Sequence, residues 1–209
     1  APPEVQLNSL LEYYQAGQYG DAEKLAISIT DQFPEHQFSW KVLGVVFKQT
    51  GRISESLVAV QKAVDLNPQD AAAHSNLGNT LRELEKLDEA EASCRQAIAL
   101  KPDFAEAHSN LGNSLQEMGR LNEAEASYRQ AIALKSNYAT AHYNLGGTLQ
   151  LLGRLGEAEA SYRQAISIIP DYAQAYNNLG STLQELDRSE EAEANYRQAI
   201  ALKPDYADA

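Results

Sequence analysis

Three histidines are the first residues in the sequence whose type and spacing could do chemistry. His74, His108 and His142 lie 34 positions apart, and a regular row of imidazoles resembles a set of metal ligands. Trp40 and Tyr176 occupy the same place in the neighbouring segments. Adjacent helices pack with their axes about 8–10 Å apart, so equivalent positions cannot share a zinc ion at about 2.0–2.1 Å. We therefore interpret these rings as packing residues and predict no metal site and no cofactor.

Paired glutamates and one cysteine are the other candidates for catalysis. Glu89 and Glu91 could act as paired acids, and Cys94 could act as a nucleophile. The glutamate pattern recurs at the spacing of the histidines, however, and acidic residues in a first helical turn complement the helix dipole, while an arginine four residues later forms an i,i+4 pair. Cys94 stands where a later segment has Tyr128, so we interpret it as a small core residue. The sequence shows no phosphate loop and no nucleophile–base pair, and we expect a chain that is not an enzyme.

A row of asparagines predicts a binding site. One asparagine in each recurring segment falls on a helix face away from the core positions; around Asn110 that face also carries Glu106, Asn113 and Glu117. A carboxamide both donates and accepts hydrogen bonds, so such a row could bind the backbone of an extended peptide without reading its side chains. The alternative, in which asparagine here serves solubility and helix pairing, stays open. The predicted peptide-binding residues are Asn76, Asn110, Asn144, Asn178, Asn79, Asn113, Glu83, Glu117 and Glu185.

The net charge limits the class of partner. Seventeen Lys and Arg stand against 29 Asp and Glu, which gives a net charge of −12, and this charge repels phosphate backbones and anionic membranes. We expect a neutral to basic protein or peptide as the partner, and no nucleic acid. No run approaches the roughly 18 apolar residues of a membrane-spanning helix, and the first residues do not resemble a secretory signal. The single cysteine requires no oxidising compartment, so we expect no membrane insertion and a cytoplasmic location.

An internal repeat must position all of these residues. The segment EAEASCRQAIALK begins at Glu89, and close copies begin at Glu123, Glu157 and Glu191, each 34 positions after the last. A period of this length indicates a repeat architecture without separate globular domains. Residues 207–209 are expected to open a truncated seventh repeat. The frame predicts a single array over residues 1–209 with repeats at 3–36, 37–70, 71–104, 105–138, 139–172 and 173–206.

Each repeat is predicted to be two helices joined by a tight turn. In the repeat 105–138, apolar residues recur at helical spacing on both sides of the turn. Gly119 suits the left-handed residue that ends a helix, Asn122 could cap the next helix, and Asp103 could cap the first. Such a hairpin cannot bury its own apolar face, so neighbouring repeats must share one core. The predicted fold class is all-α, a right-handed α-solenoid of six 34-residue helix-turn-helix repeats.

One pattern of small, aromatic and proline residues runs through the second repeat: Trp40, Leu43, Gly44, Phe47, Ser56, Ala63 and Pro68. This pattern resembles the tetratricopeptide repeat. The resemblance implies a non-catalytic protein whose stacked first helices line a concave groove for an extended peptide or a partner helix. The asparagine row is similar to that of the repeat arm of O-linked N-acetylglucosamine transferases and related bacterial proteins, which recruits protein substrates. The carboxylate-clamping mode of chaperone adaptors needs cations on successive first helices, and the third to fifth repeats lack them at the corresponding positions.

Two functions therefore stay open. The first is a protein–protein interaction module with a peptide or helix in its groove, as part of a larger protein or alone. The alternative is a scaffold that assembles by end-to-end or dimeric stacking. Its basis is the last repeat, where Tyr196, Ile200 and Tyr206 would leave an apolar patch that favours weak association through the C-terminal end.

Overall fold

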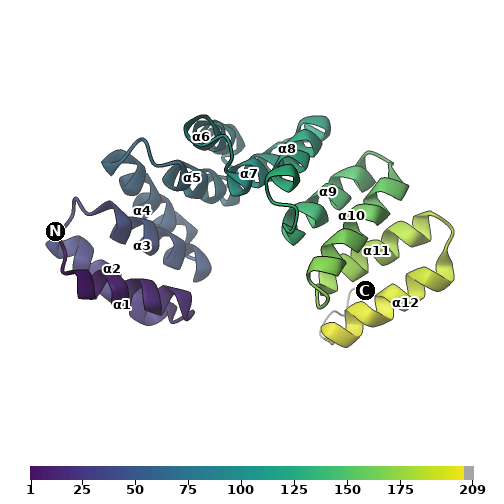
Figure 1. The fold of residues 1–209 in the computed structure, drawn as a ribbon, viewed down its shortest axis with the longest axis horizontal. Helices are drawn as coiled ribbons and strands as arrows, with labels where there is room; N and C mark the ends of the chain where they lie inside the picture. The colour runs from purple at the N-terminus through teal and green to yellow at the C-terminus, as the bar shows by residue number, and fades with distance from the viewer. Residues whose placement is uncertain (205–209) are drawn as a thin grey trace. The chain divides into compact units, whose positions relative to one another are not determined.

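The computed structural model describes residues 1–204 and is helical throughout (Figure 1). Within this range the chain forms twelve α-helices and no strand. The all-α solenoid of helical repeats predicted from the sequence is confirmed. The helices are α1 (Glu4–Gln15), α2 (Tyr19–Gln32), α3 (Gln37–Gln49), α4 (Ile53–Leu66), α5 (Ala71–Glu83), α6 (Leu87–Leu100), α7 (Ala105–Glu117), α8 (Leu121–Leu134), α9 (Ala139–Leu151), α10 (Leu155–Ile168), α11 (Ala173–Glu185) and α12 (Ser189–Leu202).

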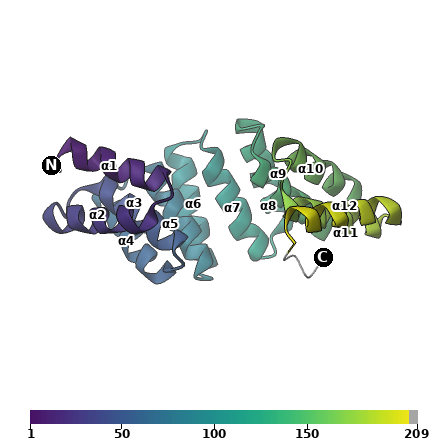
Figure 2. The ribbon, with the colours of Figure 1, turned by 90° about the horizontal axis from the view of Figure 1, so that it is seen from below.

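The helices group into two compact units, of which the first is Ala1–Asp103 and the second begins at Phe104. In the second unit, α7 packs on α8, α9 on α10 and α11 on α12, and the two helices of each pair run side by side (Figure 2). The first helix of a pair also contacts the first helix of the next, as α7 with α9 and α9 with α11. In the first unit, α3 and α5 make the same contact. We call the surface of these first helices the A face of each unit. The prediction of one array with six repeats stays a prediction.

The turn inside each pair requires a left-handed residue. Gly119 has φ of +75°, as the sequence predicted, and Asp187 takes the same conformation in the last pair with φ of +60°. The prediction that Asn122 caps the next helix is wrong, because α8 already begins at Leu121. The guanidinium of Arg120 instead donates two hydrogen bonds to the Glu123 carboxylate, each 2.7 Å long, and this pair stabilises the first turn of α8.

The prediction that Asp103 caps α7 is also wrong. The residue that precedes α7 in the capping position is Phe104, so Asp103 lies one residue too early. Asp70 stands in the correct position before α5. Its carboxylate accepts hydrogen bonds from the backbone N–H groups of Ala72 and Ala73, at 2.9 and 3.1 Å. The one-residue offset alone decides which aspartate can reach the helix N-terminus.

From α3 onward, a glycine on the first helix faces a side chain of the second helix at the closest point of each pair, whereas α1 has Leu10 in that place. Gly112 on α7 lies against Tyr128 on α8, whose side chain is only 1% exposed. A Cβ atom at Gly112 would lie 2.6 Å from Tyr128 Cε1, which is closer than two carbon atoms can approach. In the first unit Gly78 faces Cys94 in the same way. Cys94 is fully buried, and this burial raises the pKa of its thiol to about 12, which confirms its interpretation as a core residue.

We predict that Gly112→Ala destabilises the fold by about 1–3 kcal/mol, because the buried ring of Tyr128 must move to admit the new methyl group. The measurement is urea unfolding followed by circular dichroism. Gly156→Ala is the matched control, since a Cβ atom there meets nothing within 4 Å in the described part of the chain. The control should be neutral or slightly stabilising. Equal midpoints for wild type and Gly112→Ala would contradict the account of the core.

Candidate functional site

The predicted peptide-binding asparagines all lie on the first helices and are half-buried. Asn76, Asn79 and Glu83 lie on α5 in the first unit. The other six lie in the second unit: Asn110, Asn113 and Glu117 on α7, Asn144 on α9, and Asn178 and Glu185 on α11.

In the first unit the asparagines share the A face with cations that the sequence analysis missed. Asn76 and Asn79 line a hollow of about 100 Å³ together with Lys48 on α3. The ammonium of Lys48 lies 3.0 Å from the Glu83 carboxylate, and Arg82 donates a 3.3 Å hydrogen bond to Asn79 Oδ1. These cations are compensated within the fold.

A second cation on α3, Lys41, lies closer to its partner carboxylate than Lys48 does. Its ammonium lies 2.7 Å from Asp70 Oδ2, and Gln37 donates to the same oxygen at 2.8 Å. Both carboxylate oxygens of Asp70 are therefore engaged, because Oδ1 caps α5. Burial alone would raise the pKa of Asp70, but the hydrogen bonds from Lys41 and the backbone outweigh it, and the pKa lies below its ordinary value.

In the second unit the asparagines link neighbouring first helices. Asn113 Oδ1 on α7 accepts a 2.7 Å hydrogen bond from the Tyr128 hydroxyl and a 2.8 Å bond from the amide of Asn144 on α9. Thr148 on α9 likewise donates to Gln116 Oε1 on α7 at 2.8 Å. These bonds join α7 to α9 and are of the kind that the helix-pairing alternative expects.

The amide of Asn144 keeps capacity for a ligand, whereas both lone pairs of Asn113 Oδ1 are used. An amide nitrogen carries two hydrogens and the carbonyl oxygen two lone pairs, and Asn144 uses one hydrogen for its bond to Asn113. Asn178 on α11 donates to the Tyr143 hydroxyl at 3.0 Å. The structure thus brings Asn113 and Asn144 together and places Asn178 beside Tyr143.

The histidines hold the turns between pairs. His74 Nε2 lies 3.0 Å from the carbonyl oxygen of Pro68, six residues earlier, and Trp40 donates its indole N–H to the carbonyl oxygen of Pro34 at 2.8 Å. Since a carbonyl oxygen can only accept, His74 Nε2 must carry the hydrogen of this bond, as the indole nitrogen of Trp40 does. His142 makes the same contact with Ser136 at 3.0 Å. Within residues 1–204, no three His, Cys, Asp or Glu side chains are arranged to hold a metal ion.

The residues predicted for self-association lie partly in the described range. Tyr196 on α12 is half-buried, and its hydroxyl donates a 3.2 Å hydrogen bond to Gln184 Oε1. Ile200 is 42% exposed. Tyr206 lies outside the described residues. In the described range, no helix has the length and apolar character that crossing a membrane requires.

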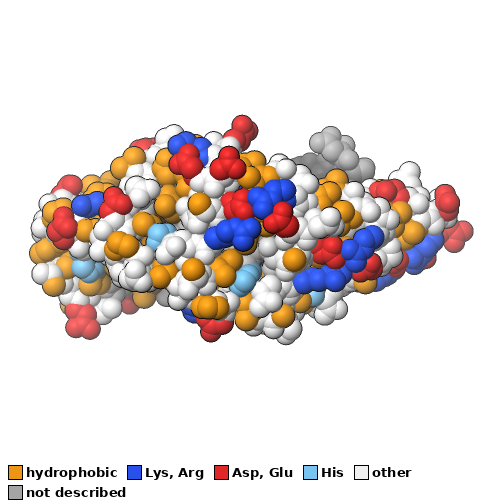
Figure 3. All heavy atoms as spheres, turned by 90° about the horizontal axis from the view of Figure 1, so that it is seen from above, with side chains coloured by type: hydrophobic (Ala, Val, Ile, Leu, Met, Phe, Trp, Pro, Cys, Tyr) orange, Lys and Arg blue, Asp and Glu red, His pale blue; other side chains and the backbone are white. Residues whose placement is uncertain are grey.

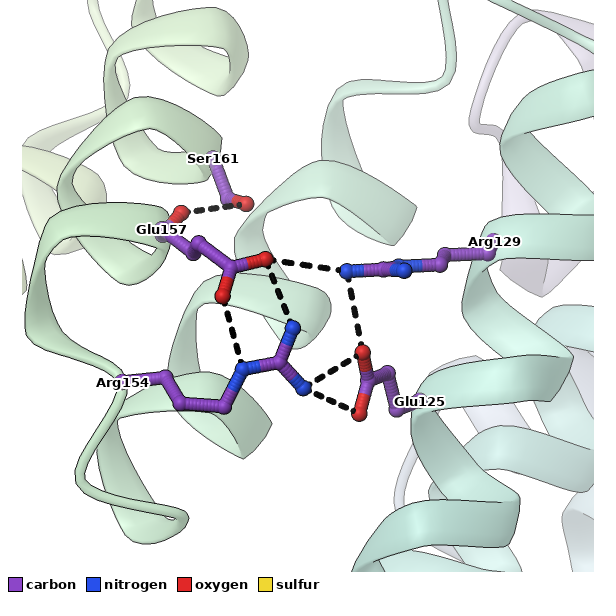
Figure 4. Close-up of polar contacts among 5 residues, drawn as sticks. All are labelled: Glu125, Arg129, Arg154, Glu157 and Ser161. Atoms are coloured by element: carbon purple, nitrogen blue, oxygen red, sulfur yellow. Dashed lines mark hydrogen bonds and ion pairs between the residues drawn. The ribbon is translucent and has the colours of Figure 1, made fainter.

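The glutamates at the start of the second helices take part in a network of ion pairs (Figure 4). The predicted i,i+4 pairs form, as between Arg129 and Glu125 at 2.9 Å. Arg154, from the turn of the next repeat, lies 2.8 Å from both Glu125 oxygens and binds both Glu157 oxygens at 2.6 and 2.7 Å. The Glu125 side chain is only 11% exposed and lies in the contact between repeats, whereas the Glu157 side chain is 53% exposed.

The same network occurs again one repeat further along the chain, between α10 and α12. Arg188 joins Glu159 at 2.6 Å to Glu191 at 2.7 Å, as Arg154 joins Glu125 to Glu157. Hydrogen bonds from Arg154 lower the pKa of Glu157. Those from Arg188 lower the pKa of Glu191 in the same way. Acidic and basic side chains accordingly lie next to one another on the surface (Figure 3).

We predict that Arg154→Gln lowers the melting temperature at pH 7 by about 2–4 °C. Because the folded-state pKa of Glu157 is lowered, its ion pairs stabilise the fold above the ordinary glutamate pKa and are lost as the pH falls through the folded-state pKa. The difference between wild type and variant should therefore shrink between about pH 6 and about pH 3. Calorimetry at each pH measures the melting temperatures of wild type and variant. Arg197→Gln is the control, since Arg197 pairs with a glutamate of its own helix in a 75% exposed position, and an equal effect of the two variants would contradict a role between repeats.

The comparisons with known proteins agree with this architecture. One family description, tetratricopeptide repeat, matches residues 103–171 and 137–205, and a second, TPR repeat, matches residues 44–81 and 78–119. Comparison with curated proteins finds no match.

Solved structures share the fold over most of the chain. A structure of PilW, a widely conserved type IV pilus biogenesis factor, is 20% identical with a TM-score of 0.88, and the similarity covers 99% of this chain and 97% of that one. TTC0263, a thermophilic TPR protein of Thermus thermophilus, is 25% identical with a TM-score of 0.72 over 82% of this chain and 94% of that one. YrrB, described as a TPR protein with an unusual peptide-binding site, is 22% identical with a TM-score of 0.63 over 87% of this chain and 93% of that one.

Proteins of this fold mediate protein–protein interactions and are typically adaptors without catalytic activity. With the repeat pattern, the helical pairs and the family matches in agreement, the chain belongs to the tetratricopeptide repeat family.

Proposed function

We propose that the A face of each unit binds extended polypeptide through its carboxamides. The observation that carries the proposal is the position of the asparagines: Asn110, Asn144 and Asn178 occur once on each of three consecutive first helices of the second unit, and Asn76 occupies the same place on α5. A peptide backbone offers an N–H and a C=O at every residue, and a carboxamide can satisfy both. The structurally similar YrrB, a TPR protein with a peptide-binding site, supports this class of ligand.

The charges of the second unit favour a neutral or basic peptide. The helices α7, α9 and α11 contain no Lys or Arg in their sequences. Glu117 and Glu185, at the ends of α7 and α11, add negative charge to this face. A basic segment would therefore be attracted to it, and an acidic segment repelled.

We predict that replacing Asn76, Asn110, Asn144 and Asn178 together by Ala weakens peptide binding at least about tenfold, since each lost hydrogen bond is worth about 0.5–1.5 kcal/mol. The measurement is fluorescence anisotropy in solution with a library of labelled, extended peptides. Asn144 also bonds Asn113, so circular dichroism must show that the variant is folded at the temperature of the titration.

The matched control removes asparagines from exposed or helix-bonded positions elsewhere. Asn122 and Asn137 are exposed, and the amide of Asn195 donates to the Glu191 carbonyl oxygen on its own helix. The triple Ala variant of these residues should bind like wild type. Unchanged affinity in the quadruple A-face variant would remove the basis of the proposal.

The second candidate function is self-assembly, which the 42% exposure of Ile200 on α12 favours. We predict that wild type shows weak, concentration-dependent association in sedimentation velocity, and that Ile200→Glu abolishes it because a charge cannot be buried in an apolar contact. A wild-type chain that stays monomeric at the highest concentration would rule out this candidate.

A further inference from the structure

On the A face of the second unit, α9 differs from its neighbours at three positions four residues apart. These positions lie on one face of the helix. The neighbouring helices carry short polar or acidic side chains there, whereas α9 carries an aromatic ring, no side chain and an apolar side chain. The three residues of α9 are Tyr143, Gly147 and Leu151; α7 has Ser109, Asn113 and Glu117, and α11 has Asn177, Ser181 and Glu185.

The ring of Tyr143 is held in place by its surroundings. Its centroid lies 5.0 Å from that of Tyr172 and 5.8 Å from that of Tyr162. Its hydroxyl accepts the 3.0 Å hydrogen bond from Asn178 on α11. Tyr143 is half-buried, so part of a fixed aromatic surface faces the solvent. A ligand that packs on it loses little side-chain entropy on the protein side.

Gly147 leaves a space where α7 has an amide. A Cβ atom at Gly147 would meet only the Tyr162 hydroxyl, at 3.6 Å, among the described residues. At the corresponding place Asn113 fills this volume and accepts from the Tyr128 hydroxyl. The buried Tyr162 donates to Gln150 Oε1 at 3.2 Å, a contact that Tyr128 also makes with Gln116. Gly147 is half-exposed, so this space opens onto the A face.

Leu151 follows Gly147 by four residues on the same face of α9, and Gln150 links the Tyr162 hydroxyl beside Gly147 to a carboxylate. The Leu151 side chain is 64% exposed, which is high for a large apolar residue on a helix of the fold. The adjacent Gln150 donates a hydrogen bond to the Glu185 carboxylate and lies 3.4 Å from the Ser181 hydroxyl. An apolar position therefore stands next to an acidic one.

We infer that Tyr143, Gly147 and Leu151 form a subsite for one large apolar side chain of an extended peptide, and that a Lys or Arg next to it in the peptide pairs with Glu185. The inference rests on the proposed function, because the carboxamides of the A face hold the backbone of the same peptide. It adds a side-chain preference to a site that otherwise binds backbone. The ring and Leu151 supply apolar walls, Gly147 supplies the room, and Glu185 supplies the charge that a basic neighbour complements.

The experiment compares soluble peptides of about twelve residues built on Gly and Ser, labelled with a fluorophore and differing only in a central pair. The pairs are Phe-Lys, Ser-Lys and Phe-Glu, and the binding constants are measured by anisotropy on the full chain. Wild type should bind Phe-Lys about tenfold or more tightly than Ser-Lys, the ratio expected for burial of one large apolar side chain. Phe-Glu should bind several-fold more weakly than Phe-Lys.

Two variants test the residues directly. Gly147→Asn introduces the residue of α7 into the space, and Leu151→Glu introduces the residue found on both neighbouring helices. Each should reduce the preference for Phe over Ser to about twofold or less, since the apolar side chain loses its room or its wall. The new Cβ atom at position 147 makes only an ordinary contact, so Gly147→Asn should fold. Val58→Glu is the matched control, because Val58 is 67% exposed on α4. This variant should prefer Phe over Ser in the peptide as strongly as wild type does.

The outcomes separate the two proposals. If no peptide of the set or of a wider library binds, the proposed function fails, and this inference fails with it. If the peptides bind but Phe-Lys and Ser-Lys bind equally to wild type, the subsite is wrong while the proposed function stands. A preference that persists in both Gly147→Asn and Leu151→Glu would likewise overturn the subsite.

Discussion

From α3 onward, the closest point between the two helices of a pair leaves no room for a side chain on the first helix. At Gly112 the facing group is the ring of Tyr128, which is buried and fixed by this contact. Because the ring is fixed, its hydroxyl reaches the A face at a defined place, where it donates to Asn113 and Gln116. Asn113 in turn binds Asn144 on the next first helix. The packing of the core thus determines where the polar groups of the A face lie.

The charges of the second unit are distributed between the two kinds of helix. In the described residues of this unit every Lys and Arg lies on a second helix or in a turn, where arginines such as Arg154 and Arg188 join glutamates of neighbouring repeats. These ion pairs neutralise the surface of the second helices. The first helices are left with carboxamides, hydroxyls and acids, and this asymmetry is the physical reason to expect a neutral or basic ligand on the A face.

The sequence predicted the features that recur from repeat to repeat, such as the left-handed Gly119 and the shared face of Asn110 and Asn113. It failed where the exact position of a residue decides the outcome, because Asp103 lies one residue before the capping position of α7 and Asn122 lies two residues after that of α8. Contacts between repeats, as of Arg154 with Glu125, depend on how helices stack and not on spacing within a helix.

The subsite on α9 was missed for a related reason. A search for recurring residues passes over positions that depart from the repeat, and Tyr143, Gly147 and Leu151 are notable because they do not recur. The other positions of the A face in the second unit recur from repeat to repeat, so the sequence could predict them. Departures from the repeat are therefore where the specificity of such a chain is to be sought.

The most direct test of the central claim, that the A face is the binding surface, is to follow the asparagine side-chain amide resonances by NMR while a Phe-Lys peptide is added. The account predicts that the amides of Asn144 and Asn178 shift with the peptide concentration, while that of Asn195 on α12 stays unchanged. Shifts confined to α12 or to the second helices, with Asn144 and Asn178 unaffected, would contradict it.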